Sequence, residues 1–220
     1  MTTIKKGDFI ELHYTGRVDN SEKPVFDTTD EKVAKKEGIY SPKTTYGTII
    51  IPLGEGYLLP GLDKQLDGQT LGKHAVQIEA KDGFGIKDVK KLQLMPMKFF
   101  KRDNIRPVPG LQINVDDQMG VVRSVSGGRV IVDFNHPLSS KDLLYEVDIL
   151  RVVDNKKEQL ESIFKVIGIK TDKLIVEEDK ATIGMPGKLP KEFTEPLSAD
   201  IKRLTGLKEI IFEDTKEKKN

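Results

Sequence analysis

The chain has 220 residues, with 36 basic and 35 acidic side chains and no cysteine. This length accommodates up to three small domains, and the lack of cysteine excludes disulfides, thiolate metal sites and a cysteine nucleophile. A net charge of +1 gives no electrostatic indication of nucleic-acid binding. The sequence shows no apolar leader and no run of about 18 apolar residues, so we expect a cytoplasmic protein that does not enter the membrane.

The first part of the chain predicts short strands around one short helix. Apolar and polar residues alternate over residues 8–18, which indicates a half-buried strand. Residues 61–71 place Leu62 and Leu66 on one face, as an amphipathic helix does. One or two helical turns are expected at residues 30–37. Further extended segments are expected at residues 24–26, 48–53 and 73–80.

The composition changes after Gly85. Residues 94–100 are dense in methionine and phenylalanine, and residues 120–125 and 129–134 are two β-branched runs on either side of Gly127 and Gly128. Adjacent glycines between such runs predict a β-hairpin. Further extended segments are expected at residues 110–114 and 143–153.

Residues 156–220 predict a small α/β domain. Its expected helices are residues 158–167 and 199–204, the second capped by Ser198, and its expected strands are residues 174–176 and 208–213. A domain of this size is marginally stable alone, and its strands offer a free edge. We therefore expect two copies to pair into a homodimer through residues 156–220. The alternative is that the domain docks on its own chain.

Motifs of hydrolases and nucleotide-binding proteins are absent from the sequence, since it has no HExxH, GxSxG or GxxxxGK[ST]. Residues 53–61 superficially resemble a dinucleotide fingerprint. Their third glycine comes two places too late, and Pro60 stands where the phosphate-binding helix would begin. The three histidines, His13, His74 and His136, are scattered, which favours structural roles over metal ligation. We expect neither a cofactor nor a bound metal.

A set of aromatic and apolar residues stands at strand ends and turns, and each of them alone fits a core. In their order and company they resemble the FKBP family of prolyl isomerases, more narrowly its SlyD-like branch and the long archaeal members. The matching segments are Tyr-Thr-Gly at 14–16, Val-Phe-Asp at 25–27, Leu-Gly-Glu-Gly-Tyr-Leu-Leu-Pro-Gly-Leu at 53–62, Gly-Phe-Gly at 83–85, Asp-Phe-Asn-His-Pro-Leu at 133–138 and Leu-Tyr-Glu-Val at 144–147.

This resemblance implies an α+β fold in which a bent antiparallel sheet wraps around one short helix. The isomerase domain would comprise residues 1–86 and 134–153. A small β domain at residues 87–133 would be inserted in its flap, and the α/β domain at residues 156–220 would follow.

The resemblance also implies a catalytic site without a nucleophile. The residues that would form it are Tyr14, Phe26, Asp27, Leu58, Leu59, Leu62, Phe84 and Tyr145. The walls of a proline pocket would be Phe26, Leu62, Phe84 and Tyr145. Leu58 and Leu59 would form its rim, with the Leu59 N–H binding a substrate carbonyl, and Tyr14 would orient Asp27 at its edge. Leu62 replaces the tryptophan of drug-binding members, and Phe84 replaces a frequent tyrosine.

The inserted domain would grip substrate chains. Met95, Met97, Phe99 and Phe100 suit a deformable surface for unfolded polypeptides, although they also suit the core of a small domain. The expected function is therefore prolyl isomerisation combined with chaperone activity on unfolded or proline-containing polypeptides. One alternative is a holding chaperone with a vestigial pocket. Another is a metallochaperone, which is disfavoured because residues 214–220 contain neither histidine nor cysteine.

Overall fold

The computed structural model describes residues 2–216, so the last four residues of the polar tail lie outside the described part. The chain divides into two compact units, Met1–Ile78 with Leu144–Asn220 as unit 1 and Glu79–Leu143 as unit 2. Short helices and largely antiparallel sheets confirm the predicted α+β class. None of the helices formed by residues 2–216 has the length and apolar character of a membrane-spanning helix.

The first sheet of unit 1 is organised around its first strand, β1 (Phe9–Val18). The strand order is β2-β1-β9-β4, and β3 also pairs with β1. The other strands are β2 (Val25–Thr28), β3 (Ile49–Pro52), β4 (Gly72–Ile78) and β9 (Leu143–Val152). Helix α1 (Glu31–Lys36) begins after Asp30, whose carboxylate accepts two of its free N–H groups.

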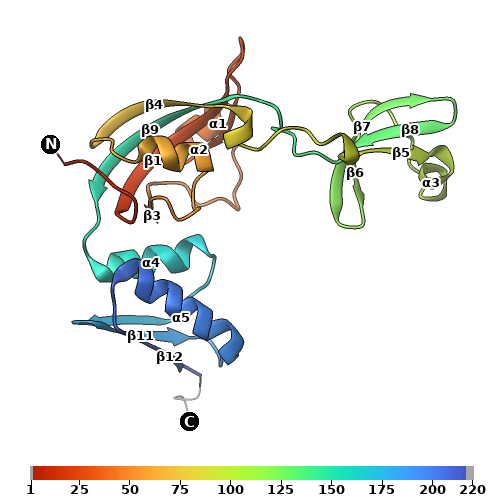
Figure 1. Cartoon of the computed structure of the whole chain (residues 1–220). Coiled ribbons are helices and arrows are strands. Elements are labelled where there is room, and N and C mark those ends of the chain that lie inside the picture. Colours follow the sequence, from red (N-terminus) through yellow and green to blue (C-terminus); the bar gives the residue numbers. More distant parts are fainter. Residues whose placement is uncertain (1, 217–220) are drawn as a thin grey trace. The chain divides into compact units, whose positions relative to one another are not determined.

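Helix α2 (Pro60–Leu66) lies beside β4 and buries Leu62 and Leu66 (Figure 1). It is shorter than the predicted helix at residues 61–71. The reason is local, because Asp67 is extended and Gly68 takes a φ of +84°. The Gly68 N–H then bonds to the Ile4 carbonyl at 2.9 Å instead of continuing the helix.

The C-terminal part of unit 1 has two helices and a three-stranded sheet. Its elements are α4 (Lys156–Val166), β10 (Lys173–Glu177), β11 (Lys180–Met185), α5 (Lys191–Thr205) and β12 (Glu209–Asp214). Strand β11 is central, antiparallel to β10 and parallel to β12. Helix α5 makes the crossover that a parallel pair requires.

One prediction for this part was wrong, and one strand was missed. The helix expected at residues 199–204 begins at Lys191, so Ser198 lies inside it rather than at its cap, and Pro196 is tolerated within it. Pro196, the sixth residue of the helix, removes one intrahelical N–H, but the apolar face of Leu197, Ile201 and Leu204 still packs on the core. Strand β11 was not predicted. Its Gly184 allows close packing, since a Cβ there would lie 3.0 Å from Lys173 Cβ.

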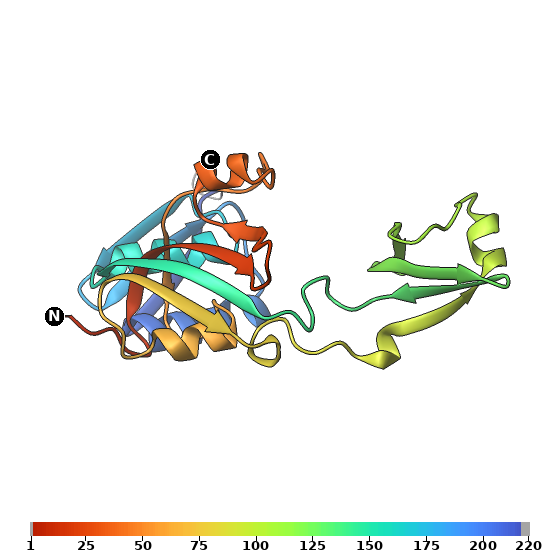
Figure 2. The same ribbon diagram turned by 90° about the horizontal axis from the view of Figure 1, so that it is seen from above.

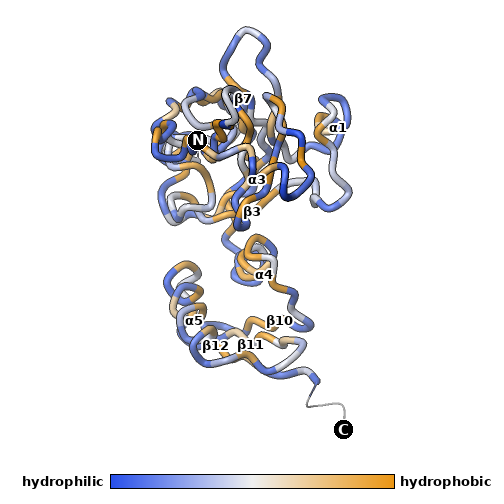
Figure 3. Tube along the Cα trace, turned by 90° about the vertical axis from the view of Figure 1, so that its right-hand side faces the viewer, coloured by the Kyte–Doolittle hydropathy of each residue, from blue (hydrophilic) through white to orange (hydrophobic). Residues whose placement is uncertain are grey.

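The C-terminal part packs against the first sheet of the same chain. Figure 3 shows α4 between β3 and the β10–β12 sheet, and its buried Leu160 and Phe164 share a core with Phe9 of β1. The apolar residues of the C-terminal part are thus buried within a single chain, so their burial alone does not require the expected dimer. Strands β10 and β12 are the outer strands of their sheet, and the homodimer stays a prediction.

Unit 2 is an antiparallel sheet of order β5-β8-β7-β6 (Figure 2). Its elements are β5 (Leu92–Pro96), α3 (Met97–Arg102), β6 (Gln112–Val115), β7 (Gln118–Ser126) and β8 (Arg129–Asp133), with short 3₁₀ turns at Ala80–Asp82 and Val89–Lys91. Gly127 and Gly128 have φ angles of +55° and +75°, which makes the predicted hairpin between β7 and β8. The core contains Phe100, Val122, Val130 and Val132.

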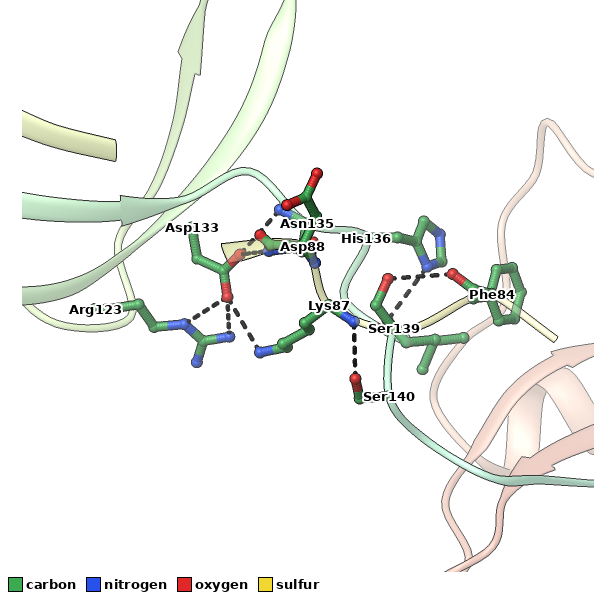
Figure 4. A network of polar contacts seen from close by, with 10 residues as sticks. Phe84, Lys87, Asp88, Arg123, Asp133, Asn135, His136, Ser139 and Ser140 are labelled. Carbon is green, nitrogen blue, oxygen red and sulfur yellow. Dashed lines mark hydrogen bonds and ion pairs between the residues drawn. The ribbon is translucent and has the colours of Figure 1, made fainter. Parts of the chain in front are cut away.

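Asp133 ties together the segments that enter and leave the small sheet (Figure 4). Its nearly buried carboxylate contacts Lys87 Nζ at 3.1 Å and Arg123 Nη2 at 2.8 Å, and it accepts the Asn135 N–H at 2.9 Å. Burial alone would raise the pKa of Asp133, but the hydrogen bonds from Asn135, Arg123 and Lys87 together hold it well below its usual range.

We predict that Asp133→Asn destabilises unit 2 by about 1.5–3 kcal/mol, because charged hydrogen bonds are lost around a buried group. Because the pKa of Asp133 is lower in the folded state than the unfolded value of about 4, its ionised carboxylate stabilises the fold above that pH. This contribution to stability is lost progressively as pH falls from about 4 toward the folded-state pKa. Amide hydrogen exchange of β7 and β8 at pH 7 and pH 3 measures both effects. Asp117→Asn, in the exposed β6–β7 turn, is the control. Equal amide protection in Asp133→Asn and the unsubstituted chain at pH 7 would contradict the assignment.

Candidate active site

Three neighbouring strands bring together the aromatic residues that were predicted far apart in sequence. Tyr14 comes from β1, Phe26 and Asp27 from β2, and Tyr145 from β9. The Tyr145 ring lies between the other two, with centroid separations of 5.8 Å to Tyr14 and 5.8 Å to Phe26. The Phe26 pair is edge-to-face at 81°, a favourable arrangement for aromatic rings. These rings form one apolar cluster in unit 1.

Asp27 stands at the exposed edge of this cluster and is held by Tyr14. The Tyr14 hydroxyl donates to Asp27 Oδ2 at 2.8 Å. Burial, and then the neighbouring Asp27 carboxylate, raise the pKa of Tyr14 far above its ordinary value. Burial likewise raises the pKa of Tyr145. Both phenols therefore keep their protons at neutral pH, and Tyr14 remains a donor that orients the carboxylate.

A β-bulge places Phe26 in the cluster. Gly16 pairs with Asp27 and Arg17 pairs with Val25, so Phe26 is the extra residue of β2. Bulges re-aim side chains in this way. A Cβ on Gly16 would lie 2.8 Å from Phe26 Cζ and 3.0 Å from Tyr145 Cε1. The glycine thus leaves the space in which both rings approach the backbone of β1.

Two buried threonines after Asp27 fix the backbone of Tyr14. The Thr28 hydroxyl donates to the Tyr14 carbonyl at 3.1 Å, and the Thr29 hydroxyl accepts the Tyr14 N–H at 3.0 Å. Neither threonine nor the role of Gly16 was predicted as part of the site. The Thr-Thr pair next to a matched Phe-Asp is the sequence signal that could have indicated them.

The predicted rim belongs to the loop before α2. Leu59 directly precedes the helix, and its carbonyl accepts the N–H groups of Leu62 at 2.9 Å and Asp63 at 3.0 Å. Leu58 and Leu59 are half-buried, whereas Leu62 is fully buried. The direction of the Leu59 peptide is therefore set by the start of the helix.

Phe84 belongs to unit 2, where Figure 4 shows it against His136. The two rings stack with centroids 4.4 Å apart and an interplanar angle of 10°. The Ser139 hydroxyl also donates to the Phe84 carbonyl at 3.2 Å. Its predicted place in the wall formed by residues of unit 1 stays a prediction.

The four residues predicted as a substrate-gripping surface have unequal exposure. Phe100 is fully buried at the centre of unit 2, so its assignment to a binding surface was wrong. Met95, Met97 and Phe99 are partly buried against the same core. For Met95 the reason is the strand period, because it pairs with Val130 on the core face of the sheet, whereas Phe100 is the buried residue of helix α3.

The opposite face of that sheet carries the exposed apolar residues. Leu94 of β5 pairs directly with Ile131 of β8, and Leu92 and Met119 are also exposed. Sequence alternation within residues 92–96 contained this information, but the dense run of methionine and phenylalanine that follows obscured it.

Comparison of the sequence with known proteins identifies the family of this chain. The model of FKBP-type peptidyl-prolyl cis-trans isomerases matches residues 1–101, and that of the FKBP26 IF domain matches residues 93–138. A short-type peptidyl-prolyl cis-trans isomerase of Methanocaldococcus jannaschii is 31% identical over 156 residues, which cover 70% of this chain and 98% of that protein. The chain belongs to the FKBP-type peptidyl-prolyl cis-trans isomerase family.

Bacterial relatives of this FKBP-type isomerase point the same way. A probable FKBP-type 16 kDa isomerase of Pseudomonas fluorescens is 30% identical over 65% of this chain and 87% of that protein. SlyD of Yersinia pestis is 30% identical over 49% of this chain and 57% of that protein. The predicted enzyme class and the likeness to SlyD are confirmed.

We predict that Gly16→Ala lowers the isomerase kcat/KM on a proline tetrapeptide about tenfold, because the new methyl group must displace the Phe26 or Tyr145 ring. Far-UV circular dichroism should remain unchanged. Thr15→Ala, one residue earlier in β1, is the comparison variant and should lose much less activity. Unchanged kcat/KM in a folded Gly16→Ala variant would show that ring placement does not limit catalysis.

Proposed function

We propose that this FKBP-type isomerase binds unfolded polypeptides and isomerises their X–Pro bonds in the apolar cluster of unit 1. The observation that carries the proposal is the meeting of Tyr14, Phe26 and Tyr145 from three strands, with Asp27 held at the edge. In the proposed complex Leu58 and Leu59 form the rim and Leu62 the floor. The Leu59 N–H binds a substrate carbonyl.

The chemistry proposed for this site needs no proton transfer. Rotation about a peptide bond faces a barrier of about 18–20 kcal/mol because amide resonance is lost midway. The twisted amide has less charge separation than the planar one, so an apolar surface disfavours it less than water does. A rate gain of about 10⁵ requires about 7 kcal/mol of preferential stabilisation. Asp27 serves as an orienting group in this mechanism, since Tyr14 fixes its carboxylate.

Unit 2 supplies the proposed second grip on a substrate chain. Met95, Met97 and Phe99 offer partly exposed, adaptable side chains, and the opposite sheet face adds Leu94 and Ile131. A short peptide would fill only the site in unit 1. An unfolded protein would reach both sites, which raises its effective concentration at the catalytic one. We also propose that the protein is located in the cytoplasm.

The principal test is Phe26→Ala, with Tyr145→Ala beside it. Each is expected to reduce kcat/KM on a proline tetrapeptide at least tenfold while circular dichroism reports an intact fold. The reason is that each truncation removes apolar surface that would contact the twisted amide. If the protein is instead a holding chaperone with a vestigial pocket, the unsubstituted protein should show no tetrapeptide turnover. Near-normal activity in a folded Phe26→Ala variant would refute the site assignment.

A second experiment separates the two grips. Replacing residues 87–133 with a short loop should leave tetrapeptide turnover within about twofold, but should reduce catalysis of a proline-limited refolding reaction by tenfold or more. The assay compares both substrates on the same preparation. Equal losses on both would show that the inserted domain has no separate binding role.

The predicted homodimer through residues 156–220 is tested by light scattering on the full chain. We expect a mass of about twice 24.7 kDa at micromolar concentration, because edge strands β10 and β12 leave unpaired backbone groups. A constant mass near 24.7 kDa would rule the dimer out.

A further inference from the structure

The loop that leads to the proposed rim is fastened to the isomerase domain by one buried carboxylate. Asp63 of α2 accepts the N–H of Gly54 at 3.0 Å and that of Gly56 at 3.3 Å. Both glycines have positive φ angles, +76° and +78°, so they turn their amides toward the helix. Glu55 lies between the two glycines in sequence, and its side chain takes no part in these two hydrogen bonds.

Glu55 is bound by the C-terminal part of the chain. Arg203 Nη1 of α5 contacts Glu55 Oε2 at 2.6 Å, and the Glu55 side chain is only 17% exposed. Arg203 Nη2 lies 3.6 Å from Asp200 one turn earlier, which steadies the guanidinium. Burial, followed by the neighbouring Asp200 and Glu55 carboxylates, raises the pKa of Tyr57.

A hollow of about 390 Å³ lies beside the loop. It is lined by Leu53, Gly54, Gly56, Leu58 and Asp63, among others, and Lys6 also lines it. Residues between β3 and α2 form no regular helix or strand. Leu58 and Leu59 stand three and four residues beyond Glu55, so Asp63 and Arg203 constrain the loop just ahead of them, and the start of α2 fixes the Leu59 peptide.

We propose that Arg203 is a positioning residue for the isomerase. Through Glu55 it holds the loop of residues 54–59 in the form that binds the substrate peptide, so the C-terminal domain contributes directly to peptide affinity. The inference rests on the proposed function in assigning Leu58 and Leu59 to the rim. It assigns to the C-terminal domain a role that does not depend on dimerisation.

Electrostatics favours this role. Burial raises the pKa of Asp63, and the nearby Glu55 carboxylate adds to this effect, whereas Lys6 opposes it. Arg203 offsets the charge of Glu55 directly, so its removal weakens the compensation of this negative charge. An exposed arginine contributes modestly to such a pair, so the expected effects are severalfold rather than complete.

The test compares Arg203→Gln with Arg151→Gln. Arg151 is a matched control, because it also links the isomerase strand β9 to the C-terminal part, through Glu158 at 2.7 Å, but does not contact the loop. We expect Arg203→Gln to raise KM for a proline tetrapeptide about two- to fivefold with little change in kcat, since the rim binds planar and twisted amides alike. Arg151→Gln should leave both constants unchanged.

Two further measurements distinguish positioning from general docking. Arg203→Lys should restore most of the lost affinity, and Glu55→Gln combined with Arg203→Gln should be no worse than either alone. About 1 M salt should raise KM of the unsubstituted enzyme toward that of Arg203→Gln, because screening removes the ion pair. Unchanged KM in Arg203→Gln, or an equal effect of Arg151→Gln, would overturn the proposal.

Amide hydrogen exchange reports on the loop without any assay of activity. Arg203→Gln should speed exchange at Gly54 and Gly56 severalfold, and Arg151→Gln should not. If Phe26→Ala kept full activity while this exchange difference appeared, the proposed catalytic site would fail and the contact on the loop would stand. If exchange were unchanged while Phe26→Ala was inactive, the positioning role alone would fail.

Discussion

The aromatic cluster of this isomerase depends on a missing side chain. The rings of Phe26 and Tyr145 meet above Gly16, where any Cβ would lie within 3.0 Å of atoms of both. The β-bulge at Phe26 and the glycine opposite it act together, because the bulge turns the ring inward and the glycine leaves it room. The hydrogen bond from Tyr14 to Asp27 then fixes the edge of the cluster. The proposed mechanism needs such a preformed surface, since without a nucleophile only shape and polarity can favour the twisted amide.

The strand that carries Tyr14 and Gly16 also anchors the C-terminal part of the chain. Phe9, at the start of β1, lies in the core formed by α4, α5 and β11. At about 3.3 Å per residue, roughly 17 Å of strand separates Phe9 from Tyr14. The C-terminal part therefore touches the isomerase domain at a hydrophobic anchor far from the rings and at a polar contact on the loop before α2. The hydrophobic contact at Phe9 explains why the C-terminal part packs on the isomerase domain. The contact of Arg203 with Glu55 is the route by which this packing would affect substrate binding in our proposal.

The sequence predicted what is periodic or shared with a family, and missed what depends on packing in three dimensions. Alternation was sufficient for β1, β4 and β9, and the family resemblance identified Tyr14, Phe26 and Tyr145, which no local pattern could bring together. Helix α5 was predicted only at residues 199–204, whereas the structure continues it through Pro196 back to Lys191. Phe100 was read as surface because composition does not reveal which face of a small sheet α3 covers. The contact between Arg203 and Glu55 joins residues 148 positions apart, beyond any sequence window.

The order of elements along the chain also governs how this protein emerges from the ribosome. Strand β9 completes the first sheet only after the whole of unit 2 has been synthesised, so the inserted sheet can form before the domain that contains it. Strand β12 pairs in parallel with β11 across α5, so the C-terminal core forms later still. The residues that carry all three aromatic rings are thus synthesised well before Arg203 can reach Glu55. The loop before α2 therefore passes through a stage in which Asp63 can bind its amides but Arg203 has not yet been added to the chain.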